Sequence, residues 1–140
     1  MANQADLQQQ VQVAESIQNQ LQQLQTQYEQ ISQYMGELTE TQEAIEELAS
    51  QSAGETVMVP VGSGAFVRAT LAEPDKVLAP LGSGVLAEEE HGQAVKRLEA
   101  RRAEAKQAQE ELTQYMDRLE GQLDELVGQL RQAQAGMAQQ

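Results

Sequence analysis

Two short segments of this 140-residue sequence contain residue types at spacings that could do chemistry. The first, Gly82-Ser83-Gly84-Val85-Leu86-Ala87, fits the degenerate pattern G-x-G-x-x-A of a dinucleotide-binding loop. Such a loop needs a βαβ unit in which the N-terminus of a helix holds the phosphate. A near-identical Gly-Ser-Gly occurs at residues 62–64, however, and a repeated hairpin turn accounts for both copies. We therefore predict no nucleotide site and no cofactor.

The second segment surrounds His91, the only histidine, which follows Glu88, Glu89 and Glu90. A zinc site needs further His or Cys ligands, and the sequence has no Cys. No nucleophile lies beside His91, so it has no partner for covalent catalysis. We predict that the protein has no metal site and is not an enzyme. We interpret the three glutamates as the exposed N-terminus of a helix, where negative charge is favoured.

The composition argues against several classes of partner. With a net charge of −13 and nine Lys and Arg in no dense patch, the chain lacks the basic surface that nucleic acids require. No stretch approaches the roughly 18 apolar residues of a membrane span, and the N-terminus has no signal-like segment. We expect a soluble cytoplasmic protein. The acidity fits glutamates flanking a coiled coil, or a salt-adapted host, and the sequence leaves both open.

Two long segments with a heptad pattern flank the motifs described above. Their seam positions recur in alternating steps of three and four, which is typical of paired helices in a coiled coil. The first seam comprises Leu7, Gln10, Ala14, Ile17, Leu21, Leu24, Tyr28, Ile31, Met35, Leu38, Gln42, Ile45 and Ala49. The second comprises Val95, Leu98, Arg102, Ala105, Gln109, Leu112, Met116, Leu119, Leu123, Leu126, Leu130, Ala133 and Met137.

The segment between the heptad regions has the pattern of β-structure. Valines alternate with other residues over 57–61, which is the period of a strand. The hexapeptide of residues 59–64, VPVGSG, recurs as APLGSG at residues 79–84. Each Gly-Ser-Gly supplies the positive φ that a tight turn demands. We therefore predict two hairpins, which turn at residues 62–64 and 82–84.

The predicted fold is α+β: a long antiparallel coiled coil of N- and C-terminal helices joined by two β-hairpins. The single chain-length domain, residues 1–140, comprises a helix over 6–52, the hairpins over 55–87 and a second helix over 89–137. Two arms of equal length, separated by hairpins that start and end close together, favour pairing within one chain over dimerisation in parallel with another chain.

The register of the coiled coil follows from matching large apolar residues. When the two residue numbers in each layer add up to 147, large side chains meet through six layers, from Met35 on Leu112 to Ile17 on Leu130. We predict this register. The next one, one heptad away with a sum of 140, pairs Leu24 with Met116 instead of Leu123.

The central segment also carries a family pattern. The run VMVPVGSGAFV of residues 57–67, followed by KVL at 76–78 and LGSG at 81–84, resembles the "VPxGxG-[SA]-[FY]-[VL] … VxxxGxG" pattern of prefoldins. Two hairpins instead of one mark the α class, as found in archaea. The resemblance covers almost the whole chain. It implies an ATP-independent chaperone that holds unfolded polypeptides and hands them to a group II chaperonin.

The same resemblance implies a hexamer of two α and four β subunits, whose hairpins form a β-barrel body. Because isolated hairpins are marginally stable and leave unpaired edges, other chains must complete them. The expected oligomerisation residues are Val57, Val59, Val61, Phe66, Val67, Val77, Leu81 and Val85. The expected client-binding residues, at the open ends of the arms, are Leu7, Val11, Val13, Leu130 and Met137. The alternative function is a structural coiled-coil tether or spacer without general client binding.

Overall fold

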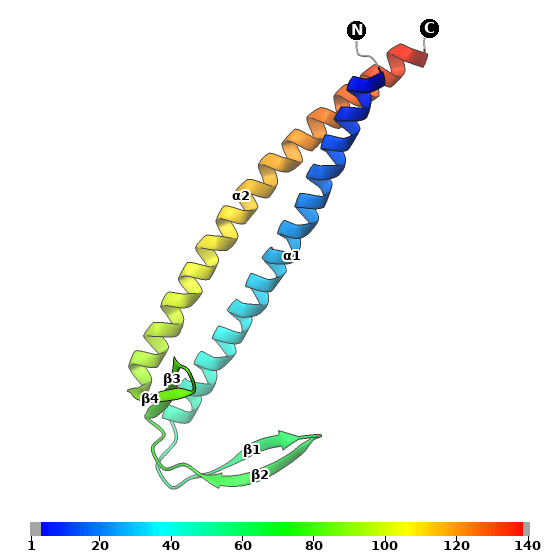
Figure 1. The fold of residues 1–140 in the computed structure, drawn as a ribbon. Coiled ribbons are helices and arrows are strands. Elements are labelled where there is room, and N and C mark those ends of the chain that lie inside the picture. The colour runs from blue at the N-terminus through cyan, green and yellow to red at the C-terminus, as the bar shows by residue number, and fades with distance from the viewer. Residues whose placement is uncertain (1–3, 139–140) are drawn as a thin grey trace. The chain divides into compact units, whose positions relative to one another are not determined.

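A computed structural model describes residues 4–138 of the chain, with side chains up to Gly136. Its elements, in chain order, are α1 (Gln4–Ala49), β1 (Thr56–Gly62), β2 (Ala65–Thr70), β3 (Lys76–Gly82), β4 (Val85–Glu90) and α2 (His91–Ala138) (Figure 1). Two long helices joined by two hairpins confirm the predicted fold class. The chain divides into a terminal unit, Met1–Gln33 with Ala105–Gln140, and a central unit, Tyr34–Glu104.

The buried side of each helix is the predicted seam. All thirteen α1 seam positions are buried or half-buried, as are the α2 positions from Val95 to Ala133. The side chain of Met137 lies outside the described residues. The most buried seam residues are Ile17 and Leu119 in the terminal unit and Leu38 and Leu98 in the central unit, at 5–7% exposure. The heptad spacing therefore identified the contact face of both helices correctly.

The register differs from the predicted one. In the terminal unit Gln109 Nε2 donates to Ser32 Oγ at 2.5 Å. In the central unit Arg102 donates to Thr39 Oγ1 at 3.1 Å, and Gln42 donates to Glu99 at 3.2 Å. The two residue numbers add up to 141 in all three bonds. A sum of 147 would displace Gln109 from Ser32 by six residues, about 9 Å along the helix, which exceeds the reach of these two side chains.

Seam residues can share a layer only at sums that differ by seven, and 140 is the one next to the observed 141. The layers therefore follow a sum of 140, and the predicted sum of 147 is wrong by one heptad. The matching of large side chains considered apolar contact alone. It left out the hydrogen bonds of the polar seam residues. It also left out the helix ends: α1 ends at Ala49 and α2 begins at His91, so in the central unit these two ends are level at a sum of 140.

The two hairpins are copies of one another, as the repeat predicts. Val59 pairs with Val67 in the first and Ala79 with Ala87 in the second, and both registers shift between the proline and the following glycine. Ser63 and Ser83 have φ of 52° and 53°, and the glycines on both sides of each serine also have positive φ. The predicted turns at residues 62–64 and 82–84 are therefore confirmed.

The glutamate triplet does not begin a helix, which corrects our interpretation. Glu88–Glu90 lie in β4, opposite Lys76–Leu78 of β3. The ammonium group of Lys76 lies 3.8 Å from a carboxylate oxygen of Glu88 and of Glu90, and this attraction favours the extended pairing. The strands thus occupy 56–90 instead of 55–87, α2 begins at His91 instead of residue 89, and α1 ends three residues before the expected 52.

Candidate assembly interface and client-binding ends

The two motifs considered for chemistry have structural roles: one is part of a hairpin and the other begins a helix. Residues 82–87 form the turn and outgoing strand of a hairpin, so no helix N-terminus follows Gly84 to hold a phosphate. His91 starts α2, and its N–H donates to the carbonyl of Asp75 at 2.9 Å. Among residues 4–138, no three His, Cys, Asp or Glu side chains gather in a way that could hold a metal ion. Nor does any helix in this range have the length and apolarity to cross a membrane.

Hairpin 1 (β1 and β2) exposes apolar side chains on both faces. Val59 and Val67 form one cross-strand pair and are 40% and 50% exposed. Met58 and Phe66, at neighbouring positions that point to the opposite face, are 68% and 56% exposed. No described element of the central unit covers either face fully. Exposed apolar surface on both sides of a two-stranded sheet is typical of an interface with other chains.

Hairpin 2 (β3 and β4) is covered on one face only. Ala79 is 7% exposed, and Glu89, which shares its face, forms a 2.5 Å ion pair with Arg97 of α2. On the other face Leu78 and Leu86 are 64% and 57% exposed. One face of hairpin 2 is therefore held by α2, and the other exposes apolar side chains.

The structure leaves six of the eight predicted oligomerisation residues exposed, and Val57 and Val77 half-buried. The prediction missed Met58, Leu78 and Leu86, which are more exposed than several of the predicted residues. The signal was available in the sequence, because an apolar residue at both alternating positions of a strand indicates that both faces are buried in the final assembly. The prediction included both faces of β2, with Phe66 and Val67, but only one face over residues 57–61, and it left out Leu78 and Leu86 of hairpin 2.

The predicted client-binding residues lie along the helix ends of the terminal unit. Val11 and Val13 are 41% and 49% exposed, whereas Leu7 and Leu130 are half-buried. One groove of about 380 Å³ runs along α1 and is lined by Leu7, Gln8, Val11, Gln12 and Glu15. A second groove, of about 300 Å³, is lined by Val13, Ile17, Gln122, Glu125, Leu126 and Gln129 from both helices. Ile17 and Leu126 were not predicted, because they lie further from the open ends of the arms than the predicted residues.

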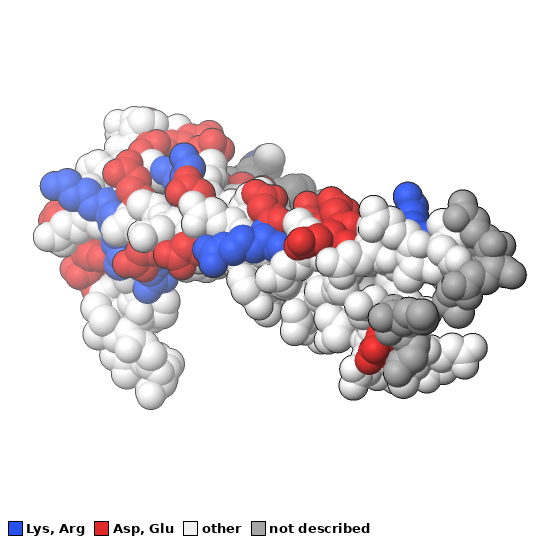
Figure 2. Space-filling model, turned by 90° about the horizontal axis from the view of Figure 1, so that it is seen from above, with Lys and Arg blue, Asp and Glu red and all other residues white. Residues whose placement is uncertain are grey.

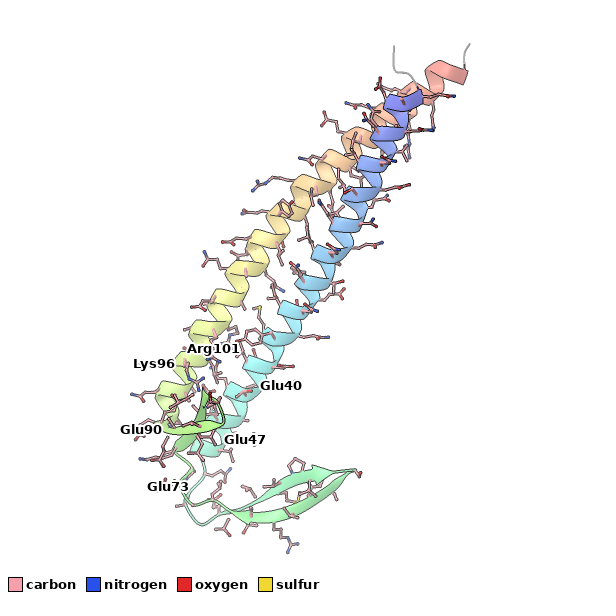
Figure 3. All side chains as sticks on the ribbon, viewed as in Figure 1. Glu40, Glu47, Glu73, Glu90, Lys96 and Arg101 are labelled. Carbon is pink, nitrogen blue, oxygen red and sulfur yellow. The ribbon has the colours of Figure 1, made fainter. Side chains whose placement is uncertain are left out.

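The helices and hairpin 1 differ in their content of charged residues. Acidic and basic side chains interleave over the surface seen in Figure 2, whereas the segment 56–70 contains one charged residue, Arg68. In the central unit, Glu40 and Glu47 extend from α1 and Lys96 and Arg101 from α2 (Figure 3). Opposite charges on the two helices favour their pairing, while the nearly uncharged hairpin 1 is suited to burial.

The chain matches known proteins over most of its length. The profile of the prefoldin family, described as "Prefoldin subunit", matches residues 17–136. A protein named prefoldin subunit alpha from Methanoregula boonei is 36% identical over 90 residues, which is 64% of this chain and 58% of that protein. The protein of the same name from Methanospirillum hungatei is 31% identical over 131 residues, which is 86% of this chain and 88% of that protein.

The fold matches a solved structure as well. A cryo-EM structure of a filamentous PFD from Methanocaldococcus jannaschii aligns with a TM-score of 0.74 and 24% identity, and it covers 84% of this chain and 97% of that one. That likeness concerns the fold alone. Together with the profile match over most of the chain and the alpha-subunit relatives, it leads to one conclusion: the chain belongs to the prefoldin family.

Proposed function

We propose that this chain is the α subunit of an ATP-independent holdase, which binds unfolded polypeptides at its helix ends and delivers them to a group II chaperonin. As a member of the prefoldin family the chain is a chaperone subunit and not an enzyme, and it assembles with other prefoldin subunits. The observation that carries the proposal is that exposed apolar side chains occur both on the hairpins of the central unit and at the helix ends of the terminal unit. We place the complex in the cytoplasm.

The hairpins are the proposed assembly region, in a hexamer of two α and four β subunits with a β-barrel body. Covering a fully exposed Val, Leu, Met or Phe contributes about 1.5–3 kcal/mol, and hairpin 1 alone presents Met58, Val61 and Phe66 at 56–68% exposure. Several such side chains supply enough free energy to offset the cost of association. The predicted residues Val57, Val59 and Val67 belong to the same hairpin, and Val77, Leu81 and Val85 belong to hairpin 2.

Substituting Val59→Asp tests the assembly region. A buried, unpaired carboxylate costs far more than the lost methyl groups contribute, so the variant should elute as a free subunit with unchanged helical circular dichroism. The measurement is size-exclusion chromatography with light scattering, in the presence of a β-type prefoldin subunit. The matched control is Val13→Asp on α1, which leaves the hairpins untouched and should still form the complex. A Val59→Asp variant that keeps the full hexamer mass refutes this part of the proposal.

The helix ends are the proposed client-binding region, with Leu7, Val11, Val13, Leu130 and Met137 as contacts. Partly exposed side chains such as Val11 and Val13 offer on the order of 1 kcal/mol each, less than fully buried ones. Useful holding therefore needs several subunits to act together through effective concentration. Weak single contacts also allow the client to leave for the chaperonin.

Deleting residues 1–13 together with 131–140 tests client binding. The truncated complex should keep its mass, because the hairpins are intact, but should protect an aggregating client less well than the full-length complex. Light scattering of several unrelated denatured proteins, without nucleotide, provides the measurement. Full protection by the truncated complex would place the client site elsewhere. A structural tether, the alternative function, predicts no protection even by the full-length complex.

A further inference from the structure

Methionine carries all the sulfur of this chain, because the sequence has no cysteine. A methionine thioether can be oxidised to the sulfoxide, and sulfoxide reductases reverse the change. The oxidant must reach the sulfur atom, so exposed methionines react first. Three methionine side chains are described: Met35 and Met116 are half-buried in the seam, whereas Met58 of β1 is 68% exposed. Met58 is therefore the most accessible oxidation site among residues 4–136.

Met58 lies on the surface that we propose other subunits cover. It shares one face of hairpin 1 with Phe66, which is 56% exposed. Among the large apolar side chains that residues 4–136 expose, it is the only methionine. Hairpin 2 has Leu78 at the equivalent position of the repeat, at 64% exposure. An aliphatic side chain thus occupies the second copy of this position, and only the first copy can be oxidised.

Oxidation makes this side chain polar and leaves the backbone intact. Hydrogen peroxide transfers one oxygen atom to the sulfur: an S–O bond forms, the O–O bond breaks, and the other oxygen leaves as water. The sulfur loses two electrons, and the peroxide gains them. The sulfoxide oxygen is a hydrogen-bond acceptor that must lose its water when a partner covers it, and burying such a group without a donor costs free energy. The thioether, by contrast, stabilises the complex when it is covered.

We propose that Met58 is a reversible oxidation site that controls assembly: peroxide converts Met58 of the free chain to the sulfoxide, and the sulfoxide keeps hairpin 1 out of the complex. In the assembled complex the same sulfur atom is covered and is oxidised slowly. Reduction of the sulfoxide makes the chain competent for assembly again. The inference rests on the proposed assembly through the hairpins and adds a control that acts on the free subunit.

Peroxide treatment of the free chain provides the test. The chain is treated with hydrogen peroxide, the peroxide is removed with catalase, and peptide mapping by mass spectrometry measures oxidation at each methionine. The treated chain is then mixed with a β-type prefoldin subunit, and the mass of the complex is followed by light scattering on dilution. We expect Met58 to be oxidised several-fold faster than Met35 and Met116, and the dissociation midpoint to rise roughly tenfold.

Two variants separate Met58 from the other effects of peroxide. Met58→Leu, which copies the residue of hairpin 2, should have the same midpoint before and after treatment, whatever its starting value. Met58→Gln, which places a permanent polar group at this position, should raise the midpoint without peroxide. Treatment of the oxidised parent chain with a methionine sulfoxide reductase should restore its original midpoint.

Four results overturn the inference: an unchanged midpoint of the treated parent chain, an equal loss in treated Met58→Leu, a loss that the reductase does not reverse, or oxidation of Met58 at the same rate in the free chain and in the complex. Val59→Asp decides the proposed assembly separately. If that variant fails to assemble while oxidation of Met58 has no effect, the hairpins assemble and Met58 does not control them. If Val59→Asp also keeps the hexamer mass, the proposed assembly fails as well.

Discussion

Polar residues within the seam set the register of the helix pair. Gln42, Arg102 and Gln109 occupy positions that are apolar in most coiled coils, and each donates a hydrogen bond to the opposite helix. Gln109 also reaches the carbonyl of Tyr28, at 3.4 Å. Each such bond contributes about 0.5–1.5 kcal/mol, and an unpaired polar group in the seam costs more. A single polar seam residue can therefore select one register.

Cysteine pairs in the terminal unit distinguish the two registers. With Leu24→Cys and Met116→Cys we expect an intrachain disulfide under mild oxidation, because these residues share a layer when the sum is 140. The pair Leu24→Cys with Leu123→Cys serves as the matched control and should crosslink slowly. Peptide mapping by mass spectrometry measures both. A dominant 24–123 crosslink would instead support the register with a sum of 147.

The same experiment in a Gln109→Leu background isolates the role of the hydrogen bonds. Without Gln109 the bonds to Ser32 and Tyr28 are lost, so the register of 147 becomes less unfavourable relative to that of 140. The yield of the 24–123 crosslink relative to the 24–116 crosslink should therefore rise at least several-fold. Gln107→Leu, at an exposed position of the same helix, should leave the ratio unchanged.

Among the elements, hairpin 2 is tied to α2 by one short ion pair. The side chains of Arg97 and Glu89 are 32% and 19% exposed, so solvent screens their attraction only in part. Ala94 of α2, three residues before Arg97, is fully buried. The ion pair links the covered face of hairpin 2 to α2.

Arg97→Ala should loosen hairpin 2 from its helix. The loss of a partly buried charged hydrogen bond costs about 1–2 kcal/mol, which corresponds to a roughly five- to thirtyfold larger open fraction. Hydrogen exchange of the β4 amides in the assembled complex measures it. Lys76→Ala removes only exposed 3.8 Å pairs and should change exchange less than about threefold. Equal effects of the two variants would show that Arg97 does not anchor the hairpin.

Elements could be predicted from the sequence where a local pattern determines them. The heptads specify which face of each helix is buried, because a period of 3.5 residues places the apolar side chains in a single stripe along the helix. Gly-Ser-Gly specifies both turns. The register could not be derived in this way, because it depends on bonds such as Gln109 to Ser32 across 77 residues. Glu88–Glu90 were misassigned for a similar reason: their strand pairing with Lys76–Leu78 of β3 outweighs a local preference for a helix start.

The candidate sites follow the same division. Exposure of the hairpins could be expected from their apolar residues, because two strands cannot cover both of their own faces. Exposure at the helix ends depends on how the pair closes there. Ile17 and Leu126 line a groove although they lie further from the helix ends than the predicted residues, and Ile17 is only 7% exposed.

At the scale of the whole molecule, the two helices differ in charge. Seven of the nine basic residues lie on α2, among them Lys96 and Arg101, and nearly balance its eight acidic residues. α1 also has eight acidic residues, among them Glu40 and Glu47, but no Lys or Arg. A salt-adapted protein depends on high salt to screen the repulsion of its acidic surface.

We expect the chain to keep its helical circular dichroism at 0.1 M NaCl, because the basic residues of α2 nearly balance the acidic residues of that helix. Raising NaCl to 1 M should increase the melting temperature only modestly, through screening of the net charge. Circular dichroism over a salt series measures both quantities, and Lys96→Glu, which removes one local balance, should increase the salt dependence. Unfolding of the parent chain below about 1 M NaCl would indicate a salt-adapted host.

The two helices join the hairpins differently. Strand β4 ends at Glu90 and α2 begins at His91, with no residue between them, whereas residues 50–55, with Gly54 at a φ of 90°, separate α1 from β1. A pull applied along α2 therefore reaches hairpin 2 directly, through a junction without a linker. A pull along α1 first straightens the segment 50–55 before it reaches hairpin 1. The junction of α2 is thus the stiff one and that of α1 the compliant one, so tension on both helices loads hairpin 2 before hairpin 1.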